Sequence, residues 1–83
     1  MKLLYFAWLK TKIGTAEEEL TPPPEVDTVA ALLDWLAALD GSHGEALADR
    51  NALGVAVNQE YARLQDPVGP DDEVALFPPV TGG

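Results

Sequence analysis

The chain has 83 residues, of which 47% are hydrophobic and 23% are charged, a balance typical of one small folded domain. Its 14 acidic residues outnumber the 5 basic ones, and the formal net charge of −9 disfavours binding to nucleic acid or to an anionic membrane surface. No cysteine is present, which excludes disulfides, a thiol nucleophile and zinc sites built on thiolates.

Charge and hydropathy also indicate the surroundings in which the chain works. The acidic charge favours docking on a basic protein surface, but it serves equally well to keep a small protein soluble. The apolar stretch at residues 3–9 is too short to span a bilayer, and no small-residue cleavage site follows it. We therefore expect a cytoplasmic protein without a membrane partner.

The first part of the chain predicts two strands and a stiff connection. Residues 2–9 are rich in aromatic and apolar side chains, which is typical of a buried strand. Gly14 signals a turn, and the acidic segment after it predicts a second strand through Leu20. The prolines at 22–24 lack backbone N–H donors, so they predict an extended connection and not a strand.

Apolar residues at three-and-four spacing then predict a helix that begins at Val29. Asp27 or Thr28 is placed to cap its N-terminus, and Gly41 is placed to end it in a left-handed C-cap. The apolar stripe comprises Val29, Leu32, Leu33, Leu36 and either Leu39 or Asp40.

The second half of the chain predicts a short helix and two more strands. Residues 44–50 add a helical turn or two, which Asn51 or Gly54 ends. Residues 53–64 return to strand character, a loop punctuated by proline and glycine follows, and residues 73–77 form a last apolar strand. One main helix on a small mixed sheet is an α+β fold.

No constellation for independent catalysis or metal binding stands out. His43 is flanked by serine and glycines, so we expect an exposed loop residue and not a general base. The acidic runs at 17–19 and 70–73 lack the ligand spacing of a calcium loop and are interpreted as solvated faces or turns. Trp8 and Trp35 are expected in the core. The chain is thus predicted to bind no metal or cofactor and not to be catalytic alone.

What remains is the end of the chain, FPPVTGG at residues 77–83. Pro78 and Pro79 would stiffen the exit from the last strand, and six extended residues beyond Phe77 reach at most about 20 Å. The final two glycines lack a Cβ, so the backbone fits where any side chain would clash. An enzyme that activates a carboxylate as an acyl-adenylate needs such an unhindered terminus. The tail therefore permits a carrier whose cargo is attached to Gly83.

The string DDEVALFPPVTGG at residues 71–83, together with VNQ at 57–59, resembles the small-subunit family of molybdopterin synthase. Members of this ubiquitin-like family are the sulfur carriers of molybdenum-cofactor biosynthesis. The resemblance implies a β-grasp fold over residues 1–77, with a small mixed sheet packed against one main helix, and an extended C-terminal tail at 78–83.

The resemblance also implies roles for the tail and for its partners. A ubiquitin-activating-like enzyme would use ATP to adenylate Gly83, and a sulfurtransferase or desulfurase would supply sulfur for a thiocarboxylate. Within a heterotetramer, the large catalytic subunit of the synthase would transfer this sulfur to cyclic pyranopterin monophosphate and form the dithiolene. Phe77 and Pro78 would dock on that subunit, and the inserted tail would comprise Pro79, Val80, Thr81, Gly82 and Gly83.

Other interpretations stay open. A sulfur carrier for thiamine synthesis or tRNA thiolation would share the two glycines but not the preceding FPPV. A ubiquitin-like modifier would form isopeptide bonds through Gly83 and leave conjugates on lysines of other proteins. A plain interaction module with an idle tail predicts that removing Gly83 changes nothing.

Overall fold

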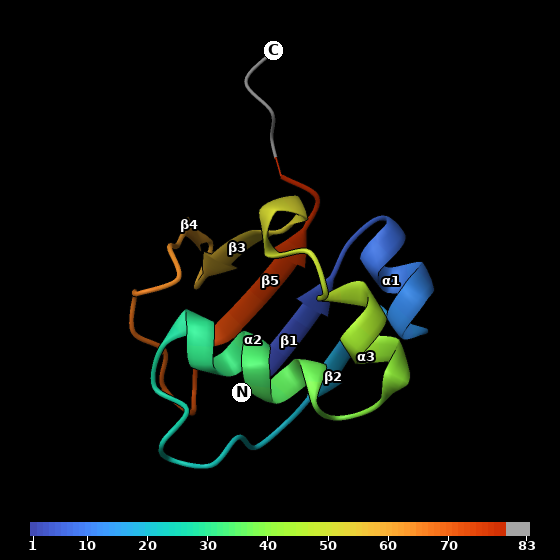
Figure 1. The fold of residues 1–83 in the computed structure, drawn as a ribbon. Helices are drawn as coiled ribbons and strands as arrows, with labels where there is room; N and C mark the ends of the chain where they lie inside the picture. Colours follow the sequence, from blue (N-terminus) through green and yellow to red (C-terminus); the bar gives the residue numbers. More distant parts are fainter. Residues whose placement is uncertain (80–83) are drawn as a thin grey trace.

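The computed structural model describes residues 1–79, which form a five-stranded mixed sheet with helices packed on one face (Figure 1). The strand order is β2-β1-β5-β3-β4; β1 and β5 pair in parallel at the centre, and the other pairs are antiparallel. This arrangement confirms the predicted α+β fold with a small mixed sheet. The strands are β1 Lys2–Tyr5, β2 Glu17–Glu19, β3 Gly54–Val57, β4 Glu60–Tyr61 and β5 Glu73–Phe77.

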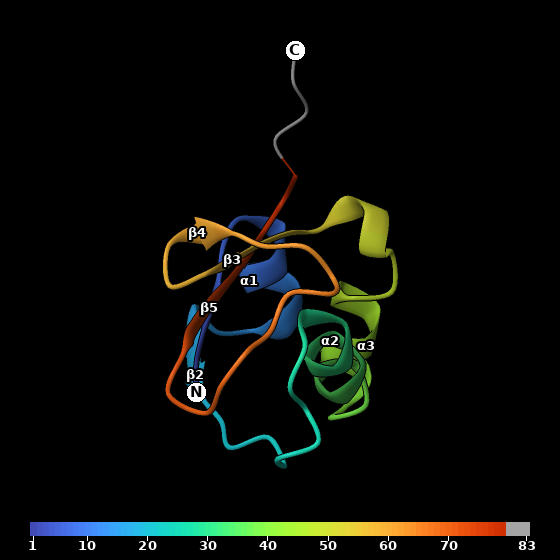
Figure 2. The ribbon, with the colours of Figure 1, turned by 90° about the vertical axis from the view of Figure 1, so that its left-hand side faces the viewer.

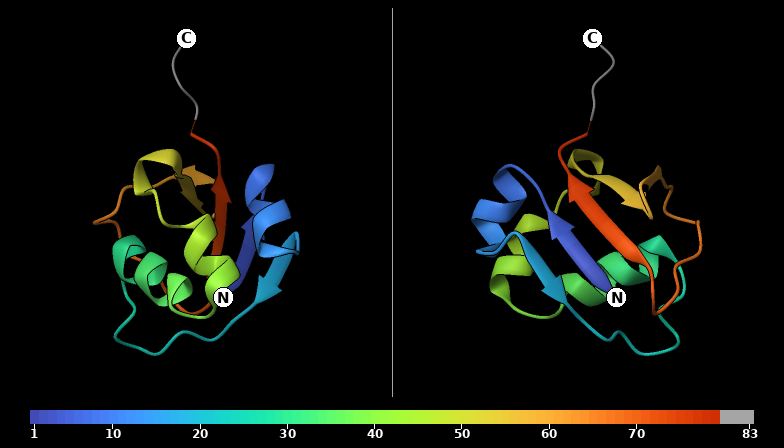
Figure 3. Two further views of the ribbon diagram at one scale, coloured as in Figure 1. Left: turned by 45° about the vertical axis from the view of Figure 1, so that its right-hand side comes forward. Right: turned by 180° about the vertical axis from the view of Figure 1, so that it is seen from behind.

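Helices α2 and α3 cover one face of the sheet (Figure 2), and α1 packs against α3 beside the end of β1. Seen from behind, the opposite face carries no helix in the described part of the chain (Figure 3). The longest helix within residues 1–79, α2, has nine residues, so none of the described helices could span a bilayer. The helices are α1 Trp8–Ile13, α2 Val29–Ala37 and α3 Gly41–Ala46, followed by the 3-10 turn η1 Arg50–Ala52.

The stripe predicted for the main helix forms the centre of the core. The Thr28 side chain caps α2 by accepting a hydrogen bond from the Ala31 backbone N–H at 3.2 Å. Four stripe residues are buried against the core-facing side chains of β1 and β5, which alternate with outward-facing ones. The buried set comprises Val29, Leu32, Leu33 and Leu36 of α2, Leu3 and Tyr5 of β1, and Val74 and Leu76 of β5.

The prediction of one strand over residues 2–9 is wrong, because β1 ends at Tyr5 and a helix begins at Trp8. Ala7 turns the chain with a φ of 56°, and its carbonyl accepts a bond from the Lys10 N–H. The turn returns Leu9 to the core but leaves Trp8 38% exposed, contrary to expectation. A short apolar run without periodicity does not distinguish strand from helix.

The predicted left-handed cap at Gly41 is also wrong. Helix α2 ends at Ala37 with a right-handed C-cap residue, Ala38, and Leu39 points outward with 40% of its surface exposed. Gly41 instead begins α3, because the Asp40 side chain caps that helix by accepting a hydrogen bond from the His43 N–H at 2.9 Å. The second helix therefore starts three residues before the predicted range of 44–50.

Residues 53–64 do not form one strand; they fold into a hairpin. The turn residues Asn58 and Gln59 have φ values of 51° and 70°, as a type I′ turn requires at both central positions. The Asn58 side chain fastens the turn to the start of β5, since its Oδ1 accepts from the Glu73 N–H at 3.0 Å. This turn brings β4 back beside β3 and pairs Tyr61 with Ala56.

His43 is buried, with 5% of its surface exposed, and is not the loop residue that we expected. Its Nδ1 lies 2.8 Å from Asp40 Oδ1, and its Nε2 lies 2.8 Å from Glu18 Oε2. The Tyr5 hydroxyl donates to the same Glu18 oxygen at 2.6 Å. Glu18 pairs with Leu3 and points to the helical face of the sheet, so the run at 17–19 is not simply a solvated face.

Candidate functional site at the exit of the tail

The central strand β5 leads directly to the C-terminal segment. It is hydrogen-bonded to β1 on one side and to β3 on the other, which fixes its position in the sheet. Val74 and Leu76 are fully buried beneath the helices, while Ala75 and Phe77 face the opposite side. Beyond Phe77 the chain leaves the sheet at the end far from the N-terminus (Figure 1). Prolines follow at once, and they cannot extend a ladder.

The structure places part of the predicted site. Phe77 lies on the face without helices, Pro78 is half-buried and Pro79 is exposed. The remaining predicted tail residues, Val80, Thr81, Gly82 and Gly83, lie outside the described residues. Their roles, including the cargo on Gly83, stay predictions.

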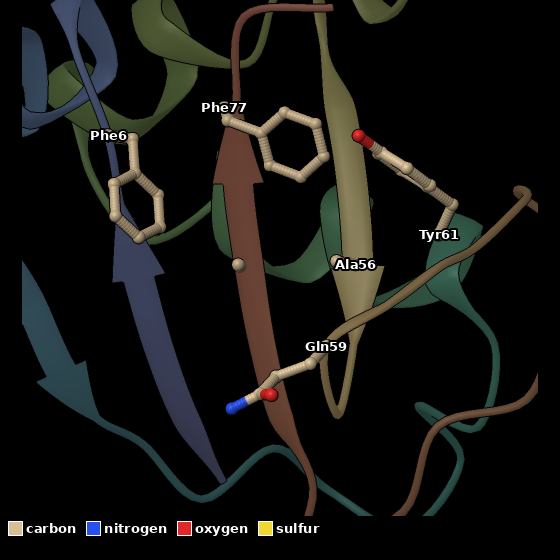
Figure 4. Close-up of a pocket in the computed structure, with 6 residues that line it drawn as sticks. Phe6, Ala56, Gln59, Tyr61 and Phe77 are labelled. Atoms are coloured by element: carbon tan, nitrogen blue, oxygen red, sulfur yellow. The ribbon is translucent and has the colours of Figure 1, made fainter.

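An open apolar hollow of about 400 Å³ lies on this outer face beside Phe77 (Figure 4). The register explains it, because Ala56 of β3 pairs with Ala75 of β5 on one side and with Tyr61 of β4 on the other. Two small side chains thus form a floor between larger ones. The hollow is lined by Phe6, Ala56, Gln59, Tyr61, Ala75 and Phe77.

The walls of the hollow are aromatic and unusually exposed. Phe6 is 49% exposed and Tyr61 is 78% exposed, although both are large apolar rings. The Phe77 ring turns away from Phe6 and meets Tyr61 edge to face, with centroids 5.8 Å apart and planes at 63° (Figure 4). Exposed aromatic rings around small residues are typical of a protein-docking surface.

A second hollow of about 470 Å³ is also lined by Phe77, together with Pro79. It contains both arginines of the chain, Arg50 and Arg63, at an otherwise apolar exit. Arg50 is held in place, since its Nη2 donates to Asp34 Oδ1 at 2.9 Å and its Nε donates to the Leu47 carbonyl at 3.1 Å. The tail exit therefore combines apolar contact area with two arginine side chains, of which Arg50 is paired with Asp34.

Several of these residues are not identified as site residues by any sequence pattern. Phe6 falls in the run that predicts a buried strand, and Tyr61 falls in the range 53–64 that predicts one continuous strand. Recognising the turn at Asn58 and Gln59 would have placed Tyr61 opposite Ala56, but this pair lacks the glycine that usually marks such a turn. The position of Arg50 and Arg63 beside Pro79 depends on tertiary folding, and no local pattern reveals it.

The outer face presents aromatic and small apolar side chains beside the tail exit. Within residues 1–79, no group of three or more histidine, aspartate or glutamate side chains could hold a metal ion. The His43 cluster is on the helical side of the sheet, away from the tail exit. This geometry fixes the positions of the exposed aromatic rings relative to the end of β5, from which the chain leaves the sheet.

Comparisons with known proteins agree with this arrangement. The model of the ThiS family matches residues 3–83. The molybdopterin synthase sulfur carrier subunit of Escherichia coli (strain K12) is 40% identical over 83 residues, which span 100% of this chain and 99% of the relative. SAMP1 from Haloferax volcanii, a small archaeal modifier protein, has a TM-score of 0.71 at 34% identity and covers 100% of this chain and 98% of its own. A putative molybdopterin converting factor, subunit 1, from Pyrococcus furiosus has a TM-score of 0.74 at 28% identity, over 95% of both chains.

These likenesses span the whole chain and confirm the resemblance drawn from residues 71–83. The neighbours SAMP1 and converting factor subunit 1 also share its fold. The chain belongs to the ThiS family, among the relatives of the molybdopterin synthase sulfur carrier subunits.

Proposed function

We propose that this chain is the sulfur-carrier subunit of a molybdopterin synthase and that Gly83 carries the sulfur as a thiocarboxylate. The observation that carries the proposal is the full-length likeness to sulfur carrier subunits, which includes the FPPVTGG end. The fold supports it, because a strand paired on both sides holds the base of the tail in place.

The proposed chemistry takes place on the terminal carboxylate and in partner enzymes. A carboxylate oxygen of Gly83 attacks the α-phosphate of ATP in a ubiquitin-activating-like enzyme, which releases pyrophosphate and leaves an acyl-adenylate. Sulfur at the oxidation level of sulfide, supplied by a sulfurtransferase or desulfurase, displaces AMP and leaves the thiocarboxylate. The carrier itself binds no cofactor in this scheme, and ATP acts only in the activating partner.

The large catalytic subunit of the synthase is the proposed acceptor partner. The tail from Pro79 to Gly83 inserts into it, and the thiocarboxylate sulfur passes to cyclic pyranopterin monophosphate. The sulfur bonds to a carbon of this precursor as an oxygen substituent leaves, which gives a thioester with Gly83. Water hydrolyses the thioester, which leaves the sulfur on the precursor and a carboxylate on Gly83. Two rounds supply the two dithiolene sulfurs. The complex works in the cytoplasm as a heterotetramer.

The outer face of the sheet is the proposed docking surface for that subunit. Phe77 contributes an aromatic ring next to the tail, and the exposed Phe6 and Tyr61 extend the contact. The net charge of −9 supports a partner with a basic surface, since opposite charges accelerate encounter and fix orientation.

Reconstitution with the purified large subunit and the pterin precursor tests this proposal. Deleting Gly83, or appending one residue after it, should abolish dithiolene formation and leave the unfolding transition of the domain unchanged. A chain lacking Gly83 that still supported dithiolene formation would refute the role of the terminus.

A protein modifier is the second candidate, and the likeness to a small archaeal modifier protein favours it. In that case the adenylate of Gly83 would be attacked by lysine amines of other proteins. Isopeptide conjugates that survive reductant and appear only with an intact Gly83 would support the modifier. A sulfur carrier for thiamine synthesis or tRNA thiolation would also form the thiocarboxylate on Gly83. It would donate the sulfur in one of those pathways and not to the pterin precursor.

A further inference from the structure

Gly54 lies at a position where the local backbone conformation does not require glycine. It is the first residue of β3 and lies directly opposite Phe77 in the antiparallel register with β5. Its φ is not in the positive range that favours glycine. Glycine weakens a strand relative to residues with side chains, and it often marks a close approach by another group.

The group that approaches Gly54 is the ring of Phe77. A Cβ added to Gly54 would overlap Phe77 Cε2 and would lie 2.7 Å from Cδ2 and 3.0 Å from Cζ. The ring therefore fills the space of the missing side chain. Tyr61 meets the same ring edge to face, at 5.8 Å between centroids.

We call this position of the Phe77 ring over Gly54 its seat. The seat determines the shape of the outer face. With the ring over Gly54, Phe77 points away from Phe6, and the hollow above Ala75 stays open between them (Figure 4). A Cβ at position 54 would force the ring out of this orientation and away from its contact with Tyr61. The geometry of the docking surface next to the tail thus depends on the absence of a side chain.

We propose that Gly54 is a positioning residue for partner docking: it seats the Phe77 ring against Tyr61 and so fixes the surface that the large subunit recognises beside the tail. This inference rests on the proposed function for the identity of the partner, but the seat itself is a property of the isolated chain.

The seat is tested first without a partner, by NMR on the chain and its Gly54→Ala variant. In the unchanged chain, the Phe77 ring should shift the Gly54 α-proton resonances, and Phe77→Leu should remove that shift. Gly54→Ala should lose the nuclear Overhauser contacts between Phe77 and Tyr61. If these contacts persist in Gly54→Ala, the glycine does not position the ring and the inference is wrong.

Calorimetric titration of the purified large subunit then tests docking in a double-mutant cycle. The cycle compares the unchanged chain, Gly54→Ala, Phe77→Leu and the variant with both changes. Gly54→Ala should weaken binding roughly three- to tenfold, as expected when a side chain is forced from its preferred rotamer. In a Phe77→Leu background the same change should have less than about a twofold effect, because leucine lacks the colliding ring. An equal loss in both backgrounds, or no loss in either, would overturn the positioning role.

Gly69→Ala is the matched control. It makes the same chemical change on a loop, where the nearest heavy atom to an added Cβ is Asp72 Oδ2 at 3.7 Å. Its affinity should equal that of the unchanged chain, and urea unfolding of each variant separates docking from stability. If the unchanged chain does not bind the large subunit, the proposed function and the docking role both fail. If it binds normally and Gly54→Ala binds equally well, only the present inference fails.

Discussion

The buried His43 cluster predicts a distinctive dependence of stability on pH. Burial disfavours the imidazolium, but the hydrogen bonds to Glu18 and Asp40 outweigh it and raise the pKa of His43 above its ordinary 6.5. A group with a raised folded-state pKa stabilises the fold fully below its ordinary pKa, and that contribution is lost as the pH rises through the folded value. The free energy of unfolding should therefore decrease as the pH rises above about 6.5.

The carboxylates of Glu18 and Asp40 set the lower pH limit of the range in which the fold is most stable. Burial would raise the pKa of Glu18, but the hydrogen bonds from Tyr5 and His43 outweigh it and lower that pKa from 4.5. Hydrogen bonds from the His43 backbone and ring lower the pKa of Asp40 from 3.8. Both contributions are present above those ordinary values and disappear as the pH falls through the lowered ones. Stability should thus be greatest between about pH 4.5 and 6.5.

The variant His43→Gln separates the contribution of His43 to the free energy of unfolding from that of the carboxylates. The contact between His43 Nε2 and Glu18 Oε2 is 2.8 Å long, with side chains that are 6% and 25% exposed. A hydrogen bond to a charged group in such a setting contributes about 1.5–3 kcal/mol. We therefore expect His43→Gln to lower the free energy of unfolding by about 2 kcal/mol at pH 6, and by less at pH 9.

Urea unfolding followed by tryptophan fluorescence measures the free energy of unfolding of both proteins across pH 5–9. The unchanged chain should lose stability on the alkaline side, and His43→Gln should be nearly flat there. Parallel curves for the two proteins would show that the titration of His43 does not affect the fold, and the assignment of a charged cluster would be wrong.

Three further changes follow from the structure. Phe77→Ala should weaken binding of the large subunit by more than about 2 kcal/mol, because it removes a central aromatic ring; unchanged affinity in a titration would exclude Phe77 from the interface. Thr28→Ala should cost about 1 kcal/mol in urea unfolding through loss of the α2 cap, and a cost near zero would mean that water replaces the cap. Gln59→Gly should raise the unfolding midpoint slightly, because glycine adopts the φ of 70° without strain; a lower midpoint would show that the Gln59 side chain stabilises the hairpin.

The elements that the sequence predicted well are those with local signals. The stripe from Val29 to Leu36 sets the period of α2, and the Thr28 hydroxyl is within reach of the N–H groups that it caps. The last strand, residues 73–77, has the alternation of a half-buried strand next to prolines that end it. The resemblance in residues 71–83 indicates the family from the sequence alone.

The predictions that are wrong or absent concern features that mostly depend on residues distant in the sequence. His43 is buried because Glu18, 25 positions away, accepts its hydrogen bond, and no local pattern contains that pair. Ala7 adopts a positive φ that its residue type does not suggest, so no local pattern predicts the helix that begins at Trp8. The significance of Gly54 appears only when the register places it opposite Phe77.

The central claim, that Gly83 carries sulfur, is tested most directly by the intact mass of the chain. The chain is incubated with its activating enzyme, ATP and a sulfur donor, alongside a chain that lacks Gly83. We predict a mass gain equal to the replacement of one oxygen by sulfur in the full chain and none in the shortened one. No gain in the full chain, with an activating enzyme that charges another carrier, would contradict the account.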